Sequence, residues 1–74
     1  MIFIKEGNTV LHYTCFNGHR RNTELLLKYK SKPNMTNNEG NTPLHLVCRS
    51  GNRLLCELLL KHKADPNLRN PITG

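Results

Sequence analysis

Two His-x-x-Cys motifs are the parts of this sequence that come closest to a chemical site. His12 and Cys15 stand three positions apart, and His45 and Cys48 repeat that spacing 33 residues later. On a helix, side chains three positions apart share a face, so each motif offers two ligands of types that zinc accepts. A tetrahedral site needs four ligands, and neighbouring packed helices would hold the two motifs roughly 10 Å apart. We therefore predict no metal and no cofactor.

The cysteines carry no signature of nucleophilic catalysis or of a disulfide framework. Nucleophilic chemistry needs a neighbouring base and an oxyanion hole, and the sequence around Cys15, Cys48 and Cys56 indicates neither. Secreted disulfide scaffolds have an even number of cysteines, whereas this chain has three and no C-x-x-C pair. We interpret all three as buried structural thiols of an intracellular protein, in the cytoplasm or nucleus. We assign no catalytic residue and predict that the chain is not an enzyme.

Length and charge narrow the class of protein further. Seventy-four residues form at most one small domain. The longest aliphatic run is three residues, whereas a membrane-spanning helix needs about 20, so we predict no membrane segment. The net charge of +6 permits a nucleic-acid or an acidic protein partner. Four aromatic residues are too few for a base-stacking platform, so nucleic acid is the less favoured partner. The main basic cluster is Lys28, Lys30, Lys32, Lys61 and Lys63.

An internal repeat of 33 residues organises the whole chain. Residues 6–38 and residues 39–71 have 18 identical positions out of 33 when they are aligned without gaps. A period of this length is typical of proteins built from stacked units. We therefore expect one repeat region over residues 1–74, with residues 72–74 beginning a further repeat that is missing or truncated.

The second repeat predicts a short helix, a turn and a longer helix. Thr42 is a good helix cap, and Pro43 suits the first helical position because its missing N–H costs nothing there. Gly51 predicts the end of that helix, since it adopts a left-handed conformation readily. A second helix is expected from about Arg53, and Pro66 excludes further helix in the loop that follows. The predicted apolar faces consist of Leu44, Val47, Cys48, Leu55, Leu58 and Leu59.

The first repeat predicts the same elements from a weaker pattern. Thr9 is again the cap, but Val10 stands where the second repeat has proline. Residues 25–27 are all leucine, and we expect them to anchor the second helix. Asn22 stands where the second repeat has Leu55, which puts a polar gap in the apolar face of this helix. The expected inner face of the first helix consists of Leu11, Thr14 and Cys15.

With this period and these motifs, the sequence resembles the ankyrin-repeat family over nearly its whole length. The match includes the signature Thr-Pro-Leu-His at residues 42–45, Gly51 after it, and the leucine run at residues 58–60 before Ala-Asp-Pro-Asn at residues 64–67. The family often has glycine where Lys30 and Lys63 stand. A residue other than glycine in a left-handed cap costs on the order of 1 kcal/mol.

The resemblance implies an all-α solenoid of two helix-turn-helix units joined by a hairpin-like loop. It also implies that each histidine supports its cap turn by hydrogen bonding. Such proteins hold another protein, as scaffold, adaptor or inhibitor, on a concave face made of loop tips and first helices. Aromatic and arginine side chains on an exposed helix face are typical anchors, and asparagines at loop tips are candidate polar contacts. The candidate partner-binding residues are Tyr13, Phe16, Asn37, Asn38, Asn41, Leu46 and Arg49.

Two alternatives stay open at this point. The basic charge allows a nucleic-acid-binding surface, whose binding would weaken steeply with salt. The absence of capping repeats allows a fragment of a longer array that has no role of its own. Stacks of this kind usually need at least three repeats, so we expect a weak cooperative transition unless further repeats or self-association stabilise the chain.

Overall fold

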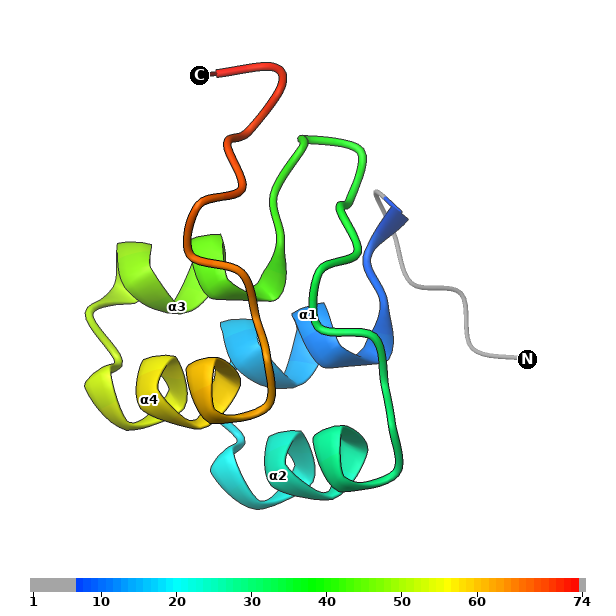
Figure 1. Cartoon of the computed structure of the whole chain (residues 1–74), viewed down its shortest axis with the longest axis vertical. Coiled ribbons are helices and arrows are strands. Elements are labelled where there is room, and N and C mark those ends of the chain that lie inside the picture. The colour runs from blue at the N-terminus through cyan, green and yellow to red at the C-terminus, as the bar shows by residue number, and fades with distance from the viewer. Residues whose placement is uncertain (1–6, 74) are drawn as a thin grey trace.

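Two pairs of helices form the described part of the chain. The computed structural model describes residues 7–73, and these contain helices α1 (Val10–Phe16), α2 (Arg20–Lys28), α3 (Pro43–Ser50) and α4 (Arg53–Lys61) with no strand. Helices α1 and α3 pack against each other in one layer, and α2 and α4 form the second layer beneath them (Figure 1). This arrangement confirms the predicted all-α stack. The predicted start of the first repeat, at residue 6, lies outside the described residues.

A threonine caps the start of the first helix of each pair, as predicted. The hydroxyl oxygen of Thr9 accepts a hydrogen bond from the backbone N–H of His12 (3.2 Å), and Nδ1 of His12 accepts one from the backbone N–H of Thr9 (3.0 Å). Thr42 and His45 make the same reciprocal pair, and Pro43 occupies the first turn. Each helix start thereby satisfies backbone donors that have no partner within the helix.

Two lysines occupy the left-handed backbone region just after the second helices. Lys30 has a φ of 68° after α2, and Lys63 has a φ of 72° after α4. Gly51, at the end of α3, has a φ of 73°, as the sequence predicts. Lysine in this conformation costs on the order of 1 kcal/mol because its Cβ crowds the following carbonyl, and glycine avoids that cost.

A single apolar core lies between the two layers. Leu26 and Leu27 face it, but Leu25 is 46% exposed, so the expectation that all three leucines anchor α2 is wrong for Leu25. Successive residues of a helix differ in direction by about 100°, so three consecutive leucines cannot all face the same core. Among residues 7–73, the core consists of the buried residues Leu11, Cys15, Leu27, Leu44, Val47, Leu55, Leu59 and Ala64.

The expectation of three buried thiols is correct only for Cys15. Cys15 is buried, whereas its equivalent Cys48 is exposed and Cys56 is partly exposed. The second repeat covers the side of the first repeat on which Cys15 lies. No described residue stacks on the same side of the second repeat, so Cys48 is left at the surface.

Candidate protein-binding surface

Two hairpin-like loops extend from the α2 and α4 layer past α1 and α3 (Figure 1). Residues 29–42 form the first loop and residues 62–73 form the second, where α4 is followed by non-helical chain. Oδ1 of Asn34 in the first loop accepts a hydrogen bond from the backbone N–H of Asp65 in the second (2.8 Å). This bond holds the two loops in register near their bases.

Asparagines shape the tips of both loops. Oδ1 of Asn37 accepts from the backbone N–H groups of Glu39 (3.0 Å) and Asn41 (2.9 Å), and its Nδ2 donates to Oδ1 of Asn8 (2.8 Å). Asn70, 33 residues later, donates in the same way to Oδ1 of Asn41 (2.8 Å). The tip of each loop is therefore tied to the segment that precedes the first helix of its own repeat.

The two histidines connect each first helix to a loop. Nδ1 of His12 accepts from Thr9, so its Nε2 carries the proton and donates to the carbonyl oxygen of Asn41 (2.8 Å). His45 bonds the carbonyl oxygen of Leu68 in the equivalent way (2.9 Å). Burial lowers the pKa of His12, against the weaker opposing effect of the bond to Asn41. With both ring nitrogens bonded to the protein, each histidine has a structural role and offers no free metal ligand.

The geometry shows no metal-binding arrangement in this part of the chain. Among residues 7–73, no three His, Cys, Asp or Glu side chains are grouped so that they could hold an ion. None of the helices found there is long and apolar enough to cross a membrane.

A cleft between α1, α3 and the first loop brings together five of the sequence-predicted contact residues. This inter-repeat cleft has a volume of about 200 Å³. Tyr13 and Phe16 are 56% and 73% exposed on its α1 side, and Leu46 and Arg49 line its α3 side. The side chain of Arg49 makes no hydrogen bond or ion pair with another residue between 7 and 73. The lining residues are Asn8, His12, Tyr13, Phe16, Asn37, Glu39, Leu46 and Arg49.

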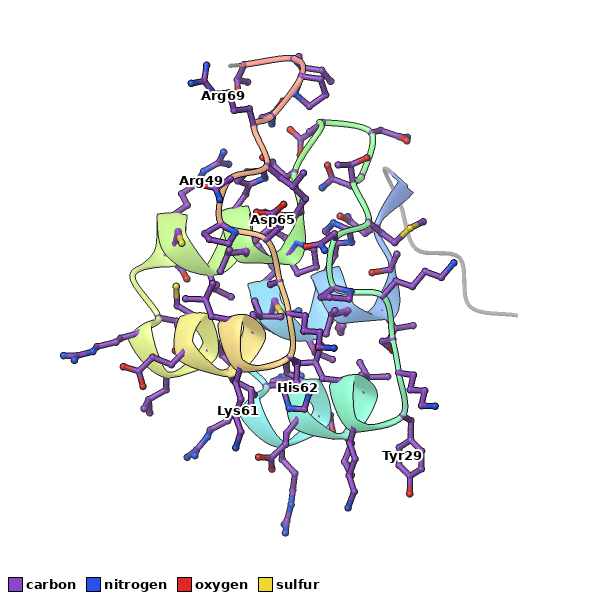
Figure 2. The ribbon with its side chains drawn as sticks, viewed as in Figure 1. Tyr29, Arg49, Lys61, His62, Asp65 and Arg69 are labelled. Carbon is purple, nitrogen blue, oxygen red and sulfur yellow. The ribbon has the colours of Figure 1, made fainter. Side chains whose placement is uncertain are left out.

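A second cleft, in the equivalent position of the second repeat, adjoins the first. This C-terminal cleft has a volume of about 350 Å³ and includes His45, Arg49 and Arg69 among its lining residues. Arg49 lines both clefts, and Figure 2 shows Arg49 and Arg69 on the same side of the molecule, above α3. The two clefts therefore form one surface along the loops and first helices, with Arg49 at their shared border.

The loop residues differ from the sequence interpretation. Asn38 is exposed at the tip. Asn41 lines the C-terminal cleft, but it is only 3% exposed and its side-chain oxygen already accepts a hydrogen bond from Asn70. Asn37 is also buried, and it holds the turn together. Conversely, Glu39 and Arg69 line the clefts and were missed. The sequence could have indicated both residues, because they lie in the two loops that were expected to contribute to binding.

Four lysines gather at the other end of the molecule. Lys30 and Lys32 from the first loop meet Lys61 and Lys63 around an open cleft of about 470 Å³, which we call the lysine cleft. Figure 2 shows Lys61 and His62 at the α2 and α4 end, far from Arg69. The molecule therefore separates a surface with exposed aromatic rings from a surface dominated by lysine.

Two stacked helix pairs with projecting loops define a helical-repeat protein. A family model described as ankyrin repeats in three copies matches residues 3–70. Because that match covers nearly the whole chain, the chain belongs to the ankyrin-repeat family. The family model is built from three copies, whereas residues 7–73 contain two helix pairs. None of the curated proteins compared with the chain matches it significantly.

Proposed function

We propose that this chain binds another protein along the inter-repeat and C-terminal clefts. Ankyrin repeats are generally protein–protein interaction modules and are typically non-enzymatic. The observation that carries the proposal is the exposure of two aromatic rings, Tyr13 and Phe16, beside Arg49, whose side chain has no polar partner among residues 7–73. A few residues carry most of the binding energy in known interfaces, and aromatic and arginine side chains are enriched there.

The chemistry of the surface indicates what a partner must present. Tyr13, Phe16 and Leu46 offer an apolar area that water solvates poorly, so a partner segment with apolar side chains fits there. Arg49 and Arg69 form the basic side of the C-terminal cleft, and an arginine fork matches a carboxylate in geometry and charge. We therefore propose an extended or helical segment with apolar anchors followed by acidic residues, held without catalysis by an intracellular protein.

The proposal can be tested without knowing the partner. Peptides selected by display against the folded chain should bind the clefts. We expect Phe16→Ser and Arg49→Ala each to weaken the selected peptides at least about tenfold, as loss of a central anchor does. Tyr29→Ser and Arg21→Ala are matched controls, because Tyr29 lies at the far end of the molecule and Arg21 is exposed on α2. Isothermal titration would measure the affinities.

The affinities of the four variants distinguish specific binding at the clefts from nonspecific binding. Equal binding by all four variants would contradict the proposal. Stronger loss in Tyr29→Ser than in Phe16→Ser would place the site at the other end of the molecule. Circular dichroism of each variant would establish that it retains its helices, so that lost binding is not lost folding.

A second candidate function rests on the lysine cleft. Four lysines around one cleft form a local positive field, which favours a polyanion such as nucleic acid. If the cleft binds nucleic acid, affinity should fall steeply with salt, and Lys61→Glu should weaken binding more than Arg49→Ala does. Fluorescence anisotropy with labelled single and double strands would measure this. Absence of binding at about 50 mM salt would exclude this function.

A further inference from the structure

The second repeat contains two thiols in direct contact near the surface. Cys48 lies in the last turn of α3 and Cys56 in the first half of α4, and their Sγ atoms are 3.6 Å apart. Cys48 is exposed and Cys56 is partly exposed. Both thiols line an open groove of about 430 Å³, together with the ion-paired side chains of Arg53 and Glu57. Small reagents from solvent therefore have access to this pair.

The equivalent place in the first repeat has no such pair. Cys15 corresponds to Cys48, but Thr23 stands where the second repeat has Cys56. Cys15 is 1% exposed, and burial raises the pKa of its thiol to about 11, so it is inert as a nucleophile. The hydroxyl of Thr23 is itself engaged, since it lies 2.8 Å from the carbonyl oxygen of His19. Cys15 in the first repeat thus provides an unreactive thiol with which the Cys48–Cys56 pair can be compared.

We propose that Cys48 and Cys56 form a dithiol modification site that reacts with low-molecular-weight disulfides and closes into an intramolecular disulfide. In the first step, the Cys48 thiolate attacks one sulfur of the reagent. A mixed disulfide forms, and one reagent thiolate leaves. In the second step, Cys56 loses its proton and attacks Sγ of Cys48, which releases the other reagent thiolate. The protein gives up two electrons and two protons, and the reagent disulfide is reduced to two thiols.

The order of the steps follows from the surroundings of the two sulfurs. Cys48 is the more exposed thiol, so an incoming reagent meets it first. Burial, the neighbouring Cys48 and the charge of Glu57 raise the pKa of Cys56, which disfavours its attack on a reagent in solution. Attack on a mixed disulfide at Cys48 needs no encounter, because the two sulfurs are already in contact.

Closure requires the two sulfurs to move only a short distance toward each other. A disulfide bond is about 2.05 Å long, so the sulfurs must approach by roughly 1.5 Å. They lie on adjacent helices of one repeat, close to the short turn that joins α3 and α4. Disulfides in a reducing compartment are transient, and a pair of this kind reopens when reduced thiols are restored.

The test uses the whole folded chain and oxidised glutathione. We expect the intact mass to fall by two hydrogens with no glutathione retained. Trypsin cleaves after Arg49 and Arg53, so Cys48 and Cys56 enter separate peptides that only the disulfide would hold together. A glutathione adduct that persists on the native chain would contradict the proposal, and so would a covalent dimer or a bond that includes Cys15.

Three serine variants sharpen the result. In Cys56→Ser, the mixed disulfide at Cys48 should accumulate because nothing can displace it. In Cys48→Ser, little reaction is expected, because the first attacking group is missing. Cys15→Ser should close as fast as the unmodified chain, and failure of this variant to close would overturn the assignment. Excess reduced glutathione should restore two free thiols to the oxidised chain.

Discussion

The two repeats carry nearly the same sequence pattern but present different faces to solvent. Cys15 and Leu27 of the first repeat are buried, whereas their equivalents Cys48 and Leu60 are exposed, Leu60 by 42%. The caps do not explain this difference, since Thr9 and Thr42 make the same bonds. Stacking explains it, because the second repeat covers one side of the first and nothing described covers that side of the second.

On the other side of each repeat, the second repeat is the buried one and the first is exposed. Leu55 and Leu59 of α4 are fully buried because the first repeat covers them. At the equivalent positions of α2, Asn22 is exposed and Leu26 is only partly buried. A polar residue thus stands where the outer edge of the first repeat meets water. Whether a residue is buried in a repeat stack depends on the neighbouring repeat as well as on the residue type. The same sequence pattern therefore gives a buried position in one repeat and an exposed position in the other.

Exchanging residues between the repeats is expected to have the largest effect. Leu55→Asn gives the second repeat the residue of the first, but in a fully buried site. We expect a loss of about 3 kcal/mol or more in the free energy of unfolding, from lost apolar contacts and an amide without partners. Urea unfolding monitored by circular dichroism would measure it.

The reverse exchange is the control. Asn22→Leu places a leucine at an exposed position of α2, and we expect a change within about 0.5 kcal/mol. Equal losses in both variants would mean that the two edges are covered alike, contrary to the structure.

The same distinction shows how far the sequence could predict the molecule. The helices, caps and left-handed turns depend on residues within a few positions, so Thr42, Pro43 and Gly51 indicated them correctly. Burial depends on which surfaces meet after folding. The pattern could not show that Cys48 is uncovered, nor that Asn41 receives a hydrogen bond from Asn70, 29 residues away.

The candidate surface was predictable in its helical part and less so in its loops. The spacing of Tyr13, Phe16, Leu46 and Arg49 placed them on the outer sides of the first helices, and the structure collects them in one cleft. Their role in binding stays a prediction. The position of Glu39 in the cleft depends on the path of the first loop. Hydrogen bonds of the buried Asn37 side chain determine that path.

The histidines are expected to show the next largest difference between the repeats. His12 is fully buried and His45 only partly, although both close a cap and bond a carbonyl group. Glutamine at this helical position retains the reciprocal cap but cannot titrate. We expect His12→Gln to lose about 1 to 3 kcal/mol in the free energy of unfolding, and His45→Gln to lose less.

The pH dependence gives this comparison a second readout. The pKa of His12 is lowered in the folded chain, so the unfolded chain binds a proton first as the pH falls. Its contribution to stability is therefore complete above about pH 6.5 and declines as the pH falls below that value through its lowered folded pKa. His12→Gln should flatten this decline, whereas His45→Gln should retain the contribution of His12. An unchanged acid profile in His12→Gln would count against a buried neutral ring.

The smallest expected effect concerns the feature that the repeats share most closely. Lys30 and Lys63 have nearly the same left-handed φ, so Lys63→Gly should relieve the crowding of Cβ that the chain now carries. Glycine also costs backbone entropy, and the net gain is about 0.5 kcal/mol in the free energy of unfolding. Lys63→Ala is the matched control, because it removes the same charge but keeps the strained Cβ, and it should give no gain.

Because the strain is local, Lys30→Gly should stabilise the chain equally in urea unfolding. Unequal gains in the free energy of unfolding would show that stacking also affects the ends of the second helices. Equal gains would show that the two repeats differ only at the surfaces that stack.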